Sequence, residues 1–141
     1  MANHAFHEIY LHITWHNDHE RSISSVVEPL VHEAILVKCR ATSGVYVHGI
    51  GGTETHVHIA VSIEPTVGIS ELIGQIKGAA SFLVNQRCSD HPINWQRGYG
   101  VVSFSRRDLP WVLAYIQNQK QHHQEGTLSA KVERIDTDAN E

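Results

Sequence analysis

A β-strand is the first element that the sequence predicts. From Phe6 to Trp15, apolar and polar residues alternate with the period of two that suits a half-buried strand. One face carries Ile9, Leu11, Ile13 and Trp15, and the other carries Tyr10, His12 and Thr14.

The pattern then changes to helical spacing. Ser25 and Glu28 stand at the spacing of a capping box, and Pro29 lies close enough to the start of a helix to be tolerated. Apolar residues follow with a period near 3.6, at Val27, Leu30, Val31, Ala34 and Ile35. A helix is therefore expected from Ser25 to about Arg40.

Two more strands form a predicted hairpin, and two more helices flank a fourth strand. Residues 44–50 alternate, Gly51 and Gly52 predict a turn, and an apolar strand follows until Glu64-Pro65. Ser70 opens a helix whose buried stripe is Leu72, Ile73, Ile76, Ala80 and Leu83. Residues 98–104 predict the fourth strand, and Asp108 is the expected cap of a third helix with Pro110 in its first turn.

The resulting order, βαββαβα, indicates an α+β fold. Its first six elements match the split βαβ, or ferredoxin-like, arrangement, a four-stranded antiparallel sheet with two helices on one face. The other face would be open to a ligand. The strand that holds His56 and His58 would be central, which would keep its side chains rigid.

The motif His56-Val57-His58 is the first candidate for chemistry. A strand sends both imidazoles to one face and Val57 to the other, so the pair is half of a divalent-metal site. A His-x-His pair by itself is more often structural than metal-binding, and twelve histidines in the chain raise the chance of coincidence.

The third helix separates packing from candidate chemistry. Its packing stripe is Leu109, Val112, Leu113 and Ile116. A neighbouring stripe is rich in amides and imidazoles and is expected to face the histidine pair, in this subunit or another; it contains Trp111, Tyr115, Asn118, Gln119 and His122. A tyrosine in such a place is commonly a packing residue with a hydrogen-bonded hydroxyl. Together, a metal pair and a tyrosine suggest phosphodiester chemistry.

Composition and charge limit the number of domains, the kind of nucleic-acid surface and the location of the protein. The 141 residues suit a single domain, at 1–124, followed by an acidic tail at 125–141. The net charge of −4 means that any nucleic-acid surface must be a local patch. No apolar run is long enough for a membrane helix and the start lacks a signal-peptide core, so we expect a cytoplasmic protein. Cys39 and Cys88 show no ligand spacing.

Several stretches together resemble a known family. They are His56-Val57-His58-Ile59-Ala60-Val61, the Lys-Gly helix 70–81, the approach 95–99, and Tyr115-Ile116-Gln117-Asn118-Gln119. In this order they resemble the single-tyrosine HUH transposases of small bacterial insertion sequences, over residues 6 to about 124.

The resemblance implies a dimeric nuclease and strand transferase that acts on single-stranded DNA with hairpin ends. Carried over by position, His56 and His58 would bind a metal, Gln119 would complete its protein ligands, and Tyr115 would be the nucleophile. The metal would be Mg²⁺ or Mn²⁺, because two imidazoles and an amide leave positions open for phosphate oxygens and water. Attack would give a 5′-phosphotyrosine and a free 3′ hydroxyl.

The sequence also offers DNA contacts and alternatives. The basic residues best placed for phosphate are Lys77, Arg97, Arg106 and Arg107, although a solvated rim is an equally good interpretation of them. His12-Ile13-Thr14 matches half of the two-histidine phosphoesterase signature, but its second copy would need a hydroxyl where Ala60 stands, which also excludes a histidine-triad hydrolase. The main rival is a catalytically idle module of the same fold that binds hairpin DNA or RNA.

Overall fold

The computed structural model describes residues 5–18 and 22–119 and contains the expected series of elements. In chain order these are β1 (Tyr10–His16), α1 (Glu28–Arg40), β2 (Val45–Gly52), β3 (His56–Ile63), α2 (Ile69–Arg87), β4 (Gly100–Phe104), a 3-10 turn η1 (Arg106–Asp108) and α3 (Leu109–Gln117).

The strands form one four-stranded sheet in the order β2-β3-β1-β4, and every neighbouring pair is antiparallel. This confirms the ferredoxin-like α+β fold and the central position of the strand that carries His56 and His58. The register places His16 opposite His56 and Thr14 opposite His58.

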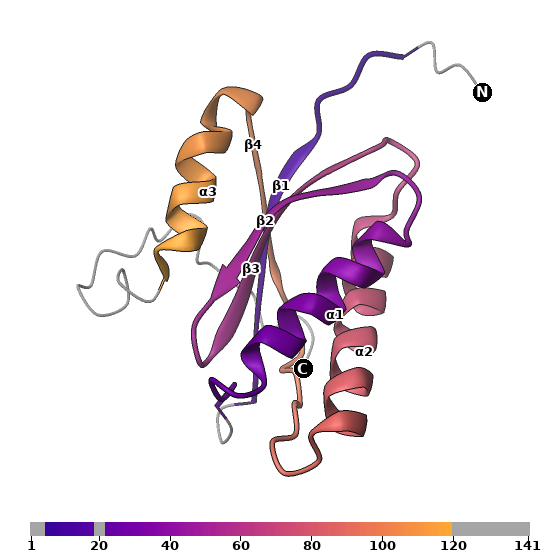
Figure 1. The fold of residues 1–141 in the computed structure, drawn as a ribbon. Helices are drawn as coiled ribbons and strands as arrows, with labels where there is room; N and C mark the ends of the chain where they lie inside the picture. Colours follow the sequence, from indigo (N-terminus) through magenta and orange to yellow (C-terminus); the bar gives the residue numbers. More distant parts are fainter. Residues whose placement is uncertain (1–4, 19–21, 120–141) are drawn as a thin grey trace.

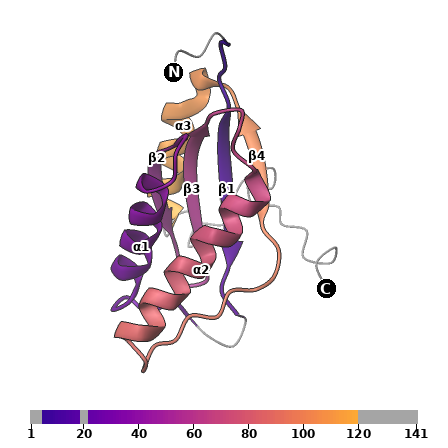
Figure 2. The same cartoon turned by 90° about the vertical axis from the view of Figure 1, so that its right-hand side faces the viewer.

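Helices cover both faces of the sheet. Figures 1 and 2 show α1 and α2 together on one face, and Figure 1 shows α3 on the opposite face. The expectation of an open second face is therefore wrong in part, since α3 packs against β2 and β3 there. Val112 and Ile116 of α3 form a small apolar cluster with Ala60 of β3.

The main core lies between the sheet and the helix pair α1 and α2. Leu11, Ile13 and Trp15 of β1 are buried there, as their alternation predicts, together with Val57 and Ile59 of β3. On the polar face of β1, His12 and Thr14 are buried as well, on the side of the sheet where α3 lies.

Local details differ from the sequence reading at three places. The first strand starts at Tyr10 and not at Phe6, although the carbonyl oxygen of Ile9 still accepts a hydrogen bond of 3.0 Å from Ile63 of β3. No capping box forms at α1: Val27 is the N-cap, and no side chain caps the helix. Gly51 and Gly52 belong to β2, so the hairpin turn lies at 53–55.

Two expectations concern the chain as a whole. The boundary between a catalytic domain at 1–124 and an acidic tail at 125–141 lies outside the described residues. Among the residues that the structure does describe, no helix is both long and apolar enough to cross a membrane.

Candidate functional site

Imidazoles from β1 and β3 gather on the sheet face beneath α3. His56 and His58 of β3 point to this face because the strand alternates, and both are buried. The antiparallel register brings His16 and His12 of β1 beside them. The ring centroids of His56 and His58 are 4.7 Å apart, those of His16 and His56 are 4.8 Å apart, and those of His12 and His58 are 4.9 Å apart.

Hydrogen bonds fix the two rings of the HUH motif through the same nitrogen. Nδ1 of His58 lies 2.8 Å from Nε2 of His12, in a fully buried contact. Nδ1 of His56 lies 2.8 Å from the hydroxyl of Thr55 and 3.1 Å from that of Thr53. Each ring is thus oriented by a neighbour at Nδ1, as metal-binding histidines are oriented by partners on their second nitrogen.

The sequence reading did not include His12, His16, Thr53 and Thr55 among the site residues. His12 could have been identified from the sequence, since the predicted strand at Phe6 to Trp15 already placed it on the polar face. The register between β1 and β3 was not available from the sequence, so the pairing of His16 with His56 could not be found.

Helix α3 brings Tyr115 to this cluster within one chain. Its phenol ring is only 4% exposed and meets His58 and His12 edge-on, with centroid distances of 6.2 and 6.4 Å. Tyr115 is therefore buried beside Val112 and Ile116, although the helical wheel placed it outside the packing stripe. A partner subunit is not required to bring the tyrosine to the histidines.

Gln119 follows Tyr115 by one helical turn and is also buried. Its Nε2 donates a hydrogen bond of 3.2 Å to the carbonyl oxygen of Tyr115. Its Oε1 is buried and has no hydrogen-bond partner among residues 5–18 and 22–119. Leaving a buried acceptor unsatisfied costs about 1–3 kcal/mol, so Oε1 is placed where a cation or donor would be favourable.

Small residues let α3 approach the sheet this closely. A Cβ atom added at Gly51 would lie 2.5 Å from the backbone oxygen of Ile116, and one at Gly49 would lie 2.6 Å from Cδ2 of Leu113. Gly49, Gly51 and Ala60 therefore form the surface against which α3 packs, on the same sheet face as the imidazoles.

The donor set determines what the site can hold. Within residues 5–18 and 22–119, no three His, Cys, Asp or Glu side chains are arranged as a metal site. Two imidazoles and one amide oxygen are a different donor set, with fewer protein ligands than a closed structural zinc site. By donor type, the imidazoles of His56 and His58, each oriented at Nδ1, and the buried amide oxygen of Gln119 would suit a divalent cation that keeps positions open for other oxygens.

The four basic residues singled out from the sequence lie in two places. Lys77 and Arg97 line a pocket of about 290 Å³ with Tyr99. The ammonium of Lys77 donates to the carbonyl oxygens of Gln96 at 2.9 Å and Gly98 at 3.2 Å, so it also holds the segment before β4. Burial lowers the pKa of Lys77.

Arg106 and Arg107 lie in η1, directly before α3. Their ion pairs are long and exposed, at 3.9 Å to Glu8 and 3.9 Å to Asp108 respectively. Such surface pairs contribute little stability and leave both guanidinium groups accessible. Asp108 is the N-cap of α3 as expected, although its side chain makes no capping hydrogen bond.

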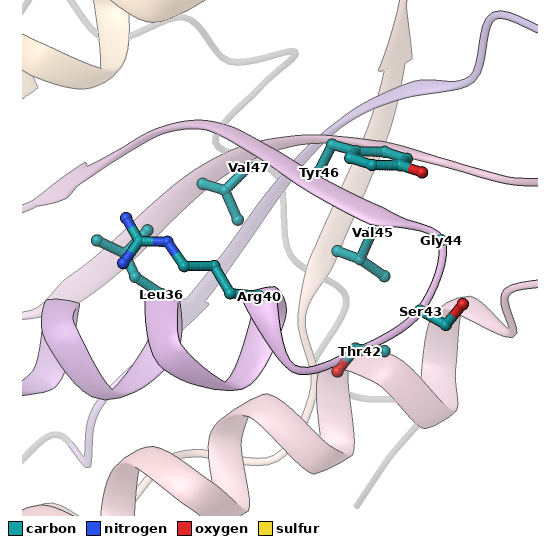
Figure 3. A pocket seen from close by; sticks show the side chains of 8 residues that line it. All are labelled: Leu36, Arg40, Thr42, Ser43, Gly44, Val45, Tyr46 and Val47. Atoms are coloured by element: carbon teal, nitrogen blue, oxygen red, sulfur yellow. The ribbon is translucent and has the colours of Figure 1, made fainter.

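A second pocket lies at the other end of the β2–β3 hairpin, where Val45 pairs with Ile63. Figure 3 shows this pocket of about 520 Å³ between the end of α1 and the start of β2, with Arg40 and Tyr46 in its lining. His58 pairs with Gly51 near the opposite end of these two strands, so the pocket lies far from the histidines. It therefore makes no contribution to the site at the histidines.

Comparisons with solved structures support the fold. Two solved structures share the fold. One is a protein from Deinococcus radiodurans R1 assigned as a candidate transposase, with a TM-score of 0.67, 15% sequence identity, and coverage of 84% of this chain and 96% of that one. The other is a REP-associated tyrosine transposase bound to a REP hairpin, with a TM-score of 0.61, 13% identity, and coverage of 91% and 76%.

The sequence itself gives the family. No curated protein matches the chain. Residues 5–119 match the family model described as "Transposase IS200 like", a span that includes both histidines of the HUH motif, the tyrosine and the glutamine. The chain therefore belongs to the IS200-like transposase family.

Proposed function

We propose that this transposase cuts and rejoins single-stranded DNA with Tyr115 as its nucleophile. The observation that carries the proposal is the burial of the Tyr115 ring against His58 and His12 on the face of the sheet. A tyrosine with only a packing role would not need a cluster of imidazoles beside it.

The phenol oxygen of Tyr115 would attack the scissile phosphate. A bond forms between that oxygen and phosphorus, and the bond from phosphorus to the 3′ oxygen breaks. The proton lost by the phenol is balanced by the one that the departing 3′ oxygen gains. The product is a 5′-phosphotyrosine, which conserves the bond energy for attack by a second 3′ hydroxyl.

A divalent cation, Mg²⁺ or Mn²⁺, would be held by His56, His58 and Gln119. When bound, it would polarise the phosphate and offset the negative charge that builds on the phosphate oxygens. The chain supports this by orienting both rings through Nδ1 and by burying Oε1 of Gln119, which has no hydrogen bond to any described residue.

His12 would act as a positioning residue for His58. For His58 to bind a cation through Nε2, its proton must be on Nδ1, where it donates to Nε2 of His12 across 2.8 Å. The near-parallel stacking of the two rings, at 20°, restricts rotation of the His58 ring as well.

The substrate would be single-stranded DNA with hairpin ends, by analogy with the REP hairpin on the structural relative. Arg106 and Arg107 would contact phosphates near the start of α3, and Lys77 and Arg97 would do so beside α2. Positive side chains at these places would supply a local basic surface on an acidic chain.

A homodimer remains part of the proposal. β2 and β4 are edge strands, and pairing two copies would cover an edge that is otherwise prone to association. Within such a dimer Tyr115 would act either on its own histidines, as in the single chain described here, or on those of the partner.

The experiment is a covalent-capture assay. The protein is incubated with labelled single-stranded hairpin DNA and Mn²⁺ and is then run on a denaturing gel. We expect a protein band shifted by covalent DNA, and we expect Tyr115→Phe to remove the shift. DNA binding without any shift in the parent protein would favour the idle binding module instead.

A further inference from the structure

We propose that Trp111 is a stacking platform for a nucleobase next to the scissile phosphate. The inference rests on the proposed function, because it takes Tyr115 as the residue that meets that phosphate. It adds a base-binding position to a site that otherwise contacts only phosphate and metal.

Trp111 is exposed although it is large and apolar. The residue is 55% exposed, whereas Val112 and Ile116 of the same helix are buried against the sheet. The other solvent-facing positions of α3 are small or polar: Pro110, Ala114 and Gln117. More than half of this large ring therefore stays outside the core, and its exposed apolar surface can serve a ligand.

The indole lies directly beside the proposed nucleophile. Its ring stacks on that of Tyr115 with a centroid distance of 5.4 Å and an interplanar angle of 19°. With one face against the phenol and more than half of the residue exposed, the opposite face of the indole is the surface available to a ligand. Trp111 precedes Tyr115 by one helical turn, or about 5.4 Å along the axis, so a nucleotide whose phosphate meets Tyr115 can reach it with its base.

Charge next to Trp111 favours a nucleic-acid strand. Arg107, one turn earlier in the chain, has a side chain that is 90% exposed, and Arg106 beside it is 72% exposed. Stacking aromatics flanked by cations are the usual device for binding single strands without sequence preference. The order Arg107, Trp111, Tyr115 would therefore align phosphate, base and scissile phosphate along one strand.

A second copy of this chain is the competing occupant of Trp111. β2 and β4 are the edge strands of the sheet, and an edge strand suits a dimer contact better than a single ring on α3 does. The observations therefore favour the nucleobase, and the experiment below includes the dimer as an outcome.

The test uses Tyr115→Phe as the background, since it keeps the ring under Trp111 and prevents cleavage. The probe is a fluorescein-labelled hairpin oligonucleotide with single-stranded thymidine flanks, and Kd is measured by anisotropy. Trp111→Ala and Trp111→Leu should each weaken binding about tenfold, and Trp111→Phe should weaken it less. Phe82→Ala is the matched control, because Phe82 is 69% exposed on α2 and should leave Kd unchanged.

A single abasic nucleotide is then moved along the strand to locate the contact. The effect of Trp111→Ala should vanish when the abasic position is the one that stacks on Trp111. The dependence of Kd on salt should stay the same in Trp111→Ala, because no charge is removed. Circular dichroism verifies that each variant is folded.

Three results would overturn the inference. Trp111→Ala could bind like its background, its effect could persist at every abasic position, or it could convert a dimer to a monomer in sedimentation, which would assign Trp111 to a protein interface. If the Tyr115→Phe background binds none of the oligonucleotides, the proposed function fails too. If the background binds and only the Trp111 effect is missing, the inference alone fails.

Discussion

Replacing Gly51 by alanine should loosen the attachment of α3 to the sheet. The new methyl group would lie 2.5 Å from the backbone oxygen of Ile116 and 2.9 Å from Cγ2 of the same residue. The first of these atoms belongs to the backbone, so it cannot be relieved by a change of rotamer, and the helix itself has to move. Gly51 is not one of the positive-φ glycines, so the effect is steric rather than conformational.

The expected size of the effect follows from these contacts. Inserting a methyl group into a packed contact costs about 1–3 kcal/mol, and for a chain of this length each kcal/mol lowers Tm by roughly 2–4 °C. Gly49→Ala should cost less, because it meets Cδ2 of Leu113, at the far end of a flexible side chain. Gly74→Ala is the matched control: it adds the same methyl group on α2 where nothing lies within 4 Å, and it should stabilise by about 0.5–1 kcal/mol.

The assay is thermal and urea unfolding of the three variants, followed by the covalent-capture reaction. Because Ile116 adjoins Tyr115, a shift of α3 by about an ångström should lower the cleavage rate about 100-fold in Gly51→Ala. Gly74→Ala should cleave like the parent protein. If Gly51→Ala were as stable as Gly74→Ala, α3 would not be seated on β2 as described, and the site would need another arrangement.

Four further predictions concern the site and the core. His58→Ala should abolish Mn²⁺-dependent cleavage and should also destabilise the fold by about 1–3 kcal/mol, because it removes a fully buried ring and the partner of His12 Nε2. Gln119→Ala should reduce cleavage less, which titration of rate against Mn²⁺ will show; an unchanged metal dependence would remove that residue from the site. His12→Leu should destabilise by about 1–3 kcal/mol, because it leaves Nδ1 of His58 buried without its partner, and urea unfolding measures this. Burial raises the pKa of Cys39 from 9.0 to about 11, so its contribution to stability is complete below pH 9 and declines as the pH rises toward 11; denaturant midpoints across that range verify the sign. Mixing Tyr115→Phe with His58→Ala subunits should restore cleavage only if the tyrosine acts in trans in a dimer, and mixtures that stay inactive would show action in cis.

Periodicity alone predicted most of the architecture. Burial in the core produces both the alternation from Ile9 to Trp15 and the helical spacing of Leu72, Ile73 and Ile76. Such spacing can be seen in the sequence without knowledge of the fold. Element boundaries were less accurate, because the ends of strands and helices depend on hydrogen bonds with partners far away in the chain.

The candidate site was predictable only in part. Spacing and the resemblance to a family singled out His56, His58, Tyr115 and Gln119, whose burial the structure shows and whose roles stay a proposal. The partnership of His12 with His58 depends on strand register, which no local pattern encodes. Gly51 was assigned to a turn because Gly-Gly is a common turn signal, whereas its role is to admit a helix from elsewhere in the chain.

The register between β1 and β3 has a consequence for where this chain can change in length. Deleting or inserting one residue within β3 would turn His56 and His58 toward the helix pair and place valine or isoleucine beneath α3. Central strands are paired on both sides, so such a change cannot be absorbed at an edge. Length variation compatible with function is thus confined to connections such as residues 88–92, while the two central strands must keep their spacing residue by residue.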